Sequence, residues 1–358
     1  MNRRWICSDV WMDILPSFDH AQLGLKMALI SPRFDVLVDK HFDGKSELTI
    51  WRRIRIDKDK GPKAKVFVLE IDGYFVAFPF PDHPWPNKIR FKDLRIDYID
   101  HSVLGFLRSN KPIWDRNGTK LELYMSLFAS SDKHLQNNWD VFVHEILPIF
   151  ATNIRHLTFA GADAFDNLRR RTSPTILTDL DQLYSITSYG LLPDGISDDG
   201  PNATAGQALA KWLHTPSKNG QPKKLRCCTY FYQITYTNNF KETFLRATTS
   251  VAYNVLLELP VASQMNIVEP FEFVNEITQE KLTLIKDKDA YYCLLKRCPI
   301  IVGETATVQQ KKDENLDNLN EVIFHLYHDC IGPLSPPDQS DEKMFSTPGP
   351  SSDQQKKD

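Results

Sequence analysis

The segment 57–68, "DKDKGPKAKVFV", places acidic side chains at alternate positions, as a calcium-binding loop does. Such a loop needs a third acidic ligand, a glycine at its sixth position and a bidentate glutamate at its twelfth. The segment lacks the third ligand and has Pro62 and Val68 at the other two positions. The sequence therefore does not predict a calcium site here.

The other reactive residue types lack the spacing that catalysis or metal binding requires. His144–Glu145 has no second histidine of a zinc-binding helix, and no glycine-rich segment has phosphate-loop spacing. The 6 cysteines include no paired CxxC motifs, so we expect reduced thiols. No serine or cysteine has the local context of a nucleophile. We expect no enzyme activity, no metal and no cofactor; an enzyme of an unrecognised kind stays open without positive sequence evidence.

Charge gives little sign of a nucleic-acid or membrane partner. The 358 residues carry 43 basic and 46 acidic side chains, a formal net charge of -3, so no basic field surrounds the protein. Arg169–Arg171 could contact nucleic acid, but such a run more often ends a helix and stays solvated. The first residues contain no apolar run of signal-peptide type, and no segment approaches a membrane span. We expect a cytoplasmic or nuclear protein.

Three short helices are predicted within residues 1–50. Ser8 is a suitable N-cap for the first helix, and Pro16 limits its end. Asp19 and Gln22 have the spacing of a capping box, which opens the second. Ser31–Pro32 supplies an N-cap followed by a proline at the first helical position, which opens the third. A bundle this small cannot cover all its apolar residues, so it packs on the rest of the chain or binds a partner.

The remaining sequence predicts an α/β domain in which strands alternate with amphipathic helices. Asp72–Gly73, between two β-rich runs, predicts a hairpin, and "IRHLTFAG" before "ADAFDNLRRR" illustrates the later alternation. We expect a degenerate solenoid or an open layered sheet, whose concave face is the first place to seek a binding surface. Paired strands are expected over 271–300 and another at "EVIFHLY". The predicted domains are a helical module at 1–50, a linker and β-hairpin at 51–86, the α/β domain at 87–330, and a disordered tail at 331–358.

The N-terminal module resembles an F-box. The matching features are "DVWMDIL", "FDHAQL" and "ALISPRFDVLV", and the order of the whole chain is similar to the expanded F-box families of nematodes. The resemblance implies that the module binds a Skp-type adaptor, and through it a cullin, while the body captures an unknown target protein for ubiquitination. The residues expected to contact the adaptor are Val10, Ile14, Leu15, Phe18, Leu23, Leu29, Ile30 and Phe34.

Three features depart from the family pattern. The leucine–proline pair at the start of the motif is Ile6–Cys7 here, the late tryptophan is Phe34, and Pro16 falls where many members continue their first helix. These departures motivate an alternative, a protein-binding scaffold with a diverged F-box-like N-terminus that no longer needs an adaptor. Pattern alone also allows the apolar residues of the module to pack on the body.

Overall fold

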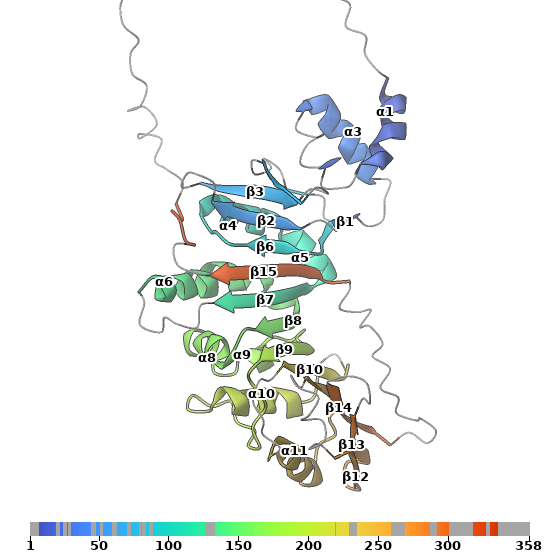
Figure 1. Cartoon of the computed structure of the whole chain (residues 1–358), viewed down its shortest axis with the longest axis vertical. Coiled ribbons are helices and arrows are strands. Elements are labelled where there is room, and N and C mark those ends of the chain that lie inside the picture. Colours follow the sequence, from blue (N-terminus) through green and yellow to red (C-terminus); the bar gives the residue numbers. More distant parts are fainter. Residues whose placement is uncertain are drawn as a thin grey trace, which may run out of the picture.

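A computed structural model gives the fold of the chain (Figure 1). It describes residues 7–18, 22–23, 27, 30–43, 48–50, 53–58, 63–69, 73–78, 80, 84–85, 89–125, 133–218, 220–228, 235–258, 269–286, 292–300, 318–326 and 330–335. Within these ranges a large α/β sheet domain follows a small helical head at the N-terminal end.

The domain is built on one mixed sheet of 13 strands in the order β12-β13-β14-β11-β10-β9-β8-β7-β15-β6-β2-β3-β4. Its strands are β2 (Ile54–Lys58), β3 (Ala64–Leu69), β4 (Phe75–Phe78), β6 (Leu94–Ile96), β7 (Thr119–Met125), β8 (Ile154–Phe159), β9 (Ser185–Tyr189), β10 (Lys223–Cys228), β11 (Tyr253–Glu258), β12 (Phe271–Asn275), β13 (Glu280–Lys286), β14 (Tyr292–Pro299) and β15 (Asn320–Leu326). Two further strands, β1 (Leu48–Ile50) and β5 (Ile89–Phe91), pair with each other in parallel.

Strand direction divides the sheet into a parallel centre and antiparallel ends. From β2 through β6, β15, β7, β8, β9 and β10 to β11, every neighbouring pair is parallel. The expected hairpin is present as the antiparallel pair β3–β4, and β2 and this hairpin belong to the main sheet. The strands expected over 271–300 close the other end as β12, β13 and β14.

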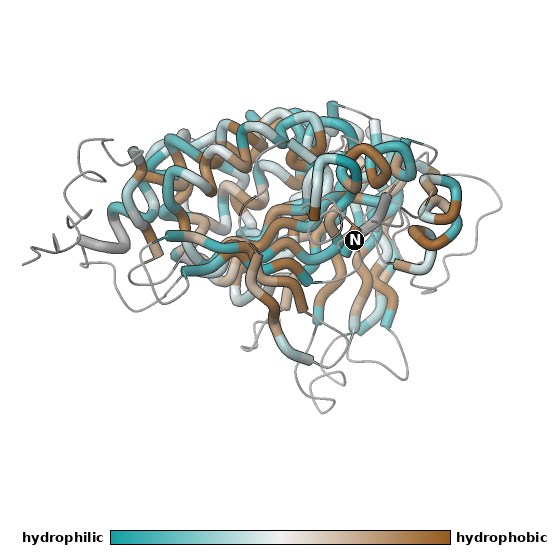
Figure 2. Tube along the Cα trace, turned by 90° about the horizontal axis from the view of Figure 1, so that it is seen from above, coloured by the Kyte–Doolittle hydropathy of each residue, from teal (hydrophilic) through white to brown (hydrophobic). Residues whose placement is uncertain are grey.

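Helices cover one face of this sheet (Figure 2). They are α4 (His101–Ser109), α5 (Lys111–Asn117), α6 (Lys133–Val141) with the π-helical turn η4 (Phe142–Ile146), α7 (Leu147–Phe150) with the 3-10 turn η5 (Ala151–Asn153), α8 (Ala162–Arg171), α9 (Ile176–Asp179), α10 (Ala205–His214) and α11 (Thr235–Leu245). The strands from β7 to β11 follow one another in both sequence and space. Because parallel crossovers are right-handed, such an order places the intervening helices on the same side.

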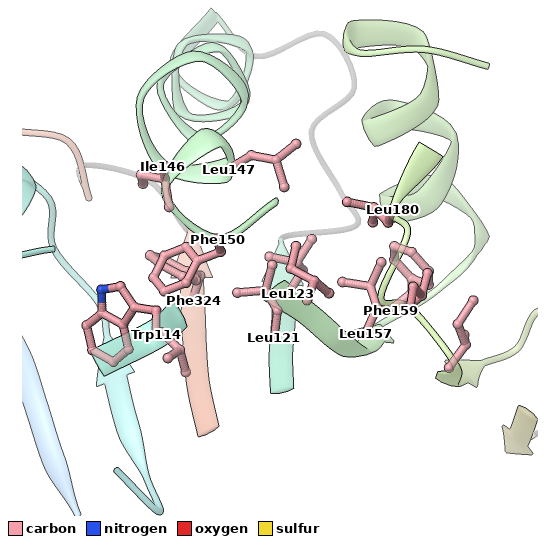
Figure 3. Packing of buried hydrophobic residues seen from close by; sticks show 14 of the residues in the cluster. Trp114, Leu121, Leu123, Ile146, Leu147, Phe150, Leu157, Phe159, Leu180 and Phe324 are labelled. Atoms are coloured by element: carbon pink, nitrogen blue, oxygen red, sulfur yellow. The ribbon is translucent and has the colours of Figure 1, made fainter. Parts of the chain in front are cut away.

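The main core lies between the helices and the sheet (Figure 3). Leu121, Leu157 and Phe324 point from adjacent strands toward the helical layer and are fully or almost fully buried. Phe324 packs against Phe150 at a ring-centroid distance of 6.1 Å, and Phe150 packs in turn against Trp114 at 5.4 Å. Burial of each large apolar side chain contributes about 1.5–3 kcal/mol, so this layer fixes which face of every strand turns inward.

Strand β15 confirms the strand expected at "EVIFHLY", but it lies far from its sequence neighbours. It is inserted between β6 and β7 and runs parallel to both. Asn320, at its first position, donates to the carbonyl of Ile113 at 2.9 Å and accepts from the backbone N–H of Phe91 at 3.0 Å. The C-terminal strand therefore joins the N-terminal part of the sheet to the repeated strand–helix units.

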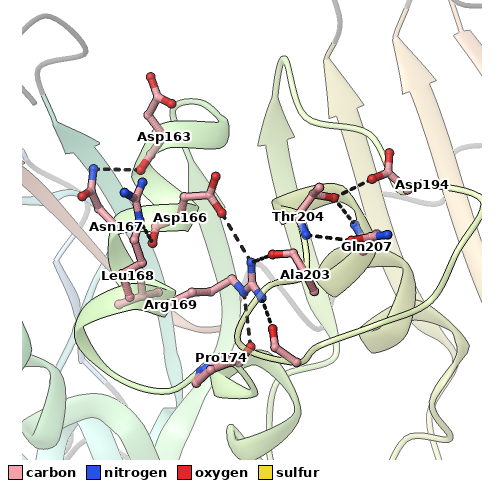
Figure 4. A network of polar contacts seen from close by, with 12 residues as sticks. Asp163, Asp166, Asn167, Leu168, Arg169, Pro174, Asp194, Ala203, Thr204 and Gln207 are labelled. Carbon is pink, nitrogen blue, oxygen red and sulfur yellow. Dashed lines mark hydrogen bonds and ion pairs between the residues drawn. The ribbon is translucent and has the colours of Figure 1, made fainter.

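The basic run ends helix α8, as the sequence predicts, but one of its arginines is buried (Figure 4). Arg169 donates to the carbonyls of Pro174, Gly200 and Ala203 at 3.2, 3.2 and 2.8 Å. The expectation that the run stays solvated is thus wrong for Arg169, because the 199–204 loop folds over it. The next helix, α10, begins at a capping box in which Thr204 accepts from the N–H of Gln207.

The helical head consists of α1 (Ser8–Ile14), the 3-10 turn η1 (Leu15–Ser17) and α3 (Pro32–Asp43). It lies beyond the end of the sheet that contains β3 and β4 (Figure 1). Ser8 is the first helical residue and Cys7 holds the N-cap position, so the expected cap at Ser8 is wrong by one residue. Helix α3 begins at Pro32 as expected, with the Ser31 hydroxyl accepting from the N–H of Phe34. Most of the predicted second helix lies outside the described residues, so the three-helix bundle stays an expectation.

Candidate functional site

The residues expected to contact an adaptor separate into buried and exposed groups. Leu15 and Leu23 have no exposed surface and belong to the protein core. Val10, Ile14 and Ile30 are exposed at 44, 36 and 60% of their surface. Phe18 and Phe34 are partly buried, and Leu29 lies outside the described residues.

One aromatic contact holds the two helices of the head together. The rings of Trp11 on α1 and Phe34 on α3 meet edge to face at a centroid distance of 4.7 Å. Phe34 therefore packs within the head instead of facing outward. Val10 and Ile14, one helical turn apart, share a face of α1 that the described part of the chain leaves exposed. Val36 of α3 is also exposed, although the resemblance does not assign it a role.

A second candidate surface is the sheet face opposite the helices, called the helix-free face here. Successive side chains of a strand point to opposite faces of the sheet. In each strand, the residues that alternate with the core residues therefore lie on the helix-free face. The register places Tyr124 beside His325, and Tyr189 beside Cys228, which lies beside Glu258. These residues stand at the carboxyl ends of parallel strands, the edge where open α/β sheets commonly bind their ligands.

At one end of this row, Asp97 joins two basic partners. Its Oδ1 lies 2.7 Å from Nδ1 of His325, and Arg55 donates to its other oxygen. Burial alone would raise the pKa of Asp97, but the hydrogen bonds and charges of His325 and Arg55 outweigh it and lower the pKa. The His325 ring meets the ring of Tyr124 edge to face at 5.1 Å. The row is thus fixed by contacts that cross β6, β15 and β7.

Lys120 links β7 to β15 through its charge. Its Nζ lies 2.9 Å from Glu122 Oε1 and 3.1 Å from Glu321 Oε1. Burial alone would lower the pKa of Lys120, but the two carboxylates raise it. Glu122 also accepts from the hydroxyl of Tyr124 at 3.1 Å, and burial together with the Glu122 charge raises the pKa of that phenol. Lys120 therefore stays charged and Tyr124 stays protonated near neutral pH.

The other end of the row contains a cysteine that is held as a thiol. Cys228 donates to Glu258 Oε2 at 3.0 Å, and Arg226 donates to the same oxygen at 2.7 Å. Burial and the neighbouring Glu258 raise the pKa of Cys228 to about 11. A nucleophilic cysteine needs its thiolate, so Cys228 is unsuited to covalent catalysis at neutral pH. Its neighbour Cys227 is buried on the opposite face, as strand alternation predicts.

His156 lies at the centre of the helix-free face and is almost completely buried. Its Nδ1 lies 2.9 Å from Ser185 Oγ and its Nε2 lies 3.1 Å from Thr158 Oγ1. Burial lowers the pKa of His156 to about 3, and the charges of Lys120 and Arg226 act in the same direction. The ring is therefore neutral and serves as a hydrogen-bonded part of the sheet.

The helix-free face presents paired charges, phenols and a protonated thiol, which suits recognition of another molecule better than bond chemistry. The alternation of Lys120, Glu122 and Tyr124 with apolar residues was a sequence signal for a polar strand face. Nothing local indicated that β15 would bring His325 beside Tyr124, because that pairing joins segments about 200 residues apart.

No family model, curated protein or solved structure matches this chain. In the described part of the chain, no group of three or more histidine, cysteine, aspartate or glutamate side chains could hold a metal ion. Among the helices of those same residues, none has the length and apolar character needed to cross a membrane. The fold and surfaces therefore define an α/β protein with a helical head, and its function follows as a proposal.

Proposed function

We propose that the protein is a substrate-recruiting subunit of a Skp–cullin–F-box ubiquitin ligase. The helical head would bind the Skp-type adaptor, and the sheet domain would capture a target protein. The observation that supports this most is the exposed apolar face of the head, on a segment whose sequence resembles an F-box. Large apolar residues grouped on one small element typically mark an interaction site.

The exposed residues are of the right kind and size for such an interface. Fully burying a valine or isoleucine side chain contributes about 1.5–3 kcal/mol, so the half-exposed Val10, Ile14 and Ile30 would each contribute about 1 kcal/mol on docking. Leu15 and Leu23, fully buried in the core, and the Trp11–Phe34 contact would keep the head in place. A pre-formed face loses less conformational entropy on binding than a disordered one.

The body would act by proximity and carry out no bond chemistry. Holding a target beside the ubiquitin-carrying enzyme raises the effective concentration of target lysines. The helix-free face, with its ordered charges and aromatic rings, is the broad polar surface that the proposal assigns to target capture. Its position on the sheet domain leaves the head available for the adaptor.

The head can be tested by co-purification of the full chain with a purified Skp-type adaptor. Val10→Asp combined with Ile14→Asp places charges on the exposed face without touching the buried Leu15. Ile277→Asp, at a residue 71% exposed in the turn between β12 and β13, is the matched control. We expect the wild type and the control to retain the adaptor and the double variant to lose it.

The scaffold alternative is favoured by a separate observation. Leu15 and Leu23, which the resemblance assigns to the adaptor, are completely buried in the core. Should the wild-type chain fail to retain the adaptor, the head would be an element of the sheet domain, and the protein a scaffold that binds partners through its body alone.

A further inference from the structure

A groove of about 560 Å³ opens in the helical layer, on the side of the sheet opposite the helix-free face. It lies between the end of α10, helix α11, and the loop 195–197. Ser197, Thr243 and Thr249 line it with hydroxyl groups, and Arg246 and Arg297 add guanidinium groups. Pockets for small molecules typically enclose about 300–1,000 Å³, so the groove can hold a small ligand.

Arg297 lines this groove with a guanidinium group that is only 1% exposed and is ion-paired with Glu280. Its Nε and Nη2 donate to Glu280 at 3.0 and 2.6 Å, and Nη2 donates to the carbonyl of Thr249 at 2.8 Å. A guanidinium has five N–H donors, so the Nη1 hydrogens are not used by these bonds. Arg246 stands at the exposed rim, with its Nη2 3.7 Å from Glu242, beyond hydrogen-bond distance. An anion in the groove would therefore meet one exposed guanidinium, that of Arg246, and one buried guanidinium, that of Arg297.

His214 adds a buried hydrogen-bond acceptor to the same wall. Its ring donates to the carbonyl of Ala210, and its Nδ1 lies 3.2 Å from Ser197 Oγ. Among the residues that the structure describes, the buried Nε2 has no hydrogen-bond partner. Burial and the charge of Arg297 lower the pKa of His214 to about 4, so the ring is neutral at neutral pH. Because Nε2 has no partner, the bond to Ala210 is donated by Nδ1, which leaves the lone pair on Nε2. A buried acceptor left unpaired costs about 1–3 kcal/mol, which a suitable donor would recover.

We propose that this groove binds a small anion that also carries an O–H or N–H donor, of the phosphate-monoester class. The anion would face the guanidinium groups of Arg297 and Arg246, and its donor would reach His214 Nε2. The hydroxyl groups of Ser197 and Thr243 would complete the coordination. This site does not depend on adaptor docking, because it is formed entirely within the sheet domain.

A comparison of phosphate with sulfate tests the two expected requirements of the site, which are a negative charge and a hydrogen-bond donor. At pH 7.5 and equal ionic strength, hydrogen phosphate carries an O–H donor, whereas sulfate carries charge alone. A ligand that binds only the folded protein raises its melting temperature. We expect phosphate to raise the melting temperature of the full chain more than sulfate does, and equal shifts would overturn the proposal. Phosphoserine and a hexose monophosphate, compared in the same assay, then distinguish a protein-borne phosphate from a metabolite.

Substitutions of groove residues test whether phosphate binds in the groove. Arg246→Gln, at an exposed side chain that the fold does not need, should weaken phosphate binding about tenfold through loss of a charge-assisted hydrogen bond. His214→Phe should abolish the preference for phosphate over sulfate. Arg170→Gln removes an exposed cation of α8 outside the groove and should leave binding unchanged. Phosphate binding that Arg246→Gln leaves intact would contradict the assignment even if His214→Phe did not fold.

Discussion

The buried His156 makes stability depend on pH in a way that can be calculated. An unfolded histidine has a pKa of about 6.5, whereas burial lowers the pKa of His156 in the folded protein to about 3. Between these values the unfolded state binds more protons, so the free energy of unfolding falls as the pH falls through 6.5. Integration from pH 8 to pH 5 gives a loss of about 2 kcal/mol from this residue.

The replacement His156→Gln keeps hydrogen-bonding groups beside Ser185 and Thr158 but removes the ionisation. Its effect at pH 8 measures the cost of the new side chain, because histidine is neutral there in both states. At pH 5 the wild type should have lost about 2 kcal/mol relative to the variant. Urea unfolding at both pH values, with the m-value checked for constancy, measures this shift. A difference between the two proteins that is the same at pH 8 and pH 5 would refute the reasoning.

Other buried groups give further predictions. Glu280→Gln should cost about 3–5 kcal/mol in urea unfolding, because it leaves the charge of Arg297 buried and only partly paired; a cost below about 1 kcal/mol would contradict this. Arg169→Ala should lower the free energy of unfolding by about 2–4 kcal/mol, because it leaves three carbonyls without their donor. Arg170→Ala, at an exposed residue, should change it by no more than about 0.5 kcal/mol. Similar losses in the two variants would show that the burial of Arg169 does not matter. A chain ending at residue 300 lacks β15 and should melt at a much lower temperature than the full chain; an unchanged melting temperature would argue against the insertion.

Local patterns predicted the elements of the sheet domain better than their arrangement. Alternation in "EVIFHLY" indicated a strand, and the basic end of α8 indicated a helix terminus. Both properties depend on neighbouring residues, which a sequence displays directly. The insertion of β15 and the burial of Arg169 depend on segments that are distant in sequence. Their contacts form only after the chain has closed long loops, so no local pattern reveals them.

For the apolar residues of the head, the sequence likewise could not predict which side chains are buried and which are exposed. Val10, Ile14 and Leu15 are apolar and close in sequence, and each fits an amphipathic helix. The structure buries Leu15 completely and exposes the other two, because the direction of α1 relative to the core decides which side turns inward. The sequence suggested only the concave face of a possible strand–helix array as a binding surface, and the residues of the helix-free face could not be named before the strand register was known.

Calorimetric titration of the full chain with a purified Skp-type adaptor tests whether the helical head is an adaptor-docking module. We expect a one-to-one complex with a dissociation constant of about 1 μM or lower, equivalent to about -8 kcal/mol, that is abolished by Val10→Asp with Ile14→Asp. We expect Ile277→Asp to leave the affinity unchanged. No measurable binding by the wild-type chain, or equal binding by the double variant, would contradict the assignment of the head as an adaptor-docking module.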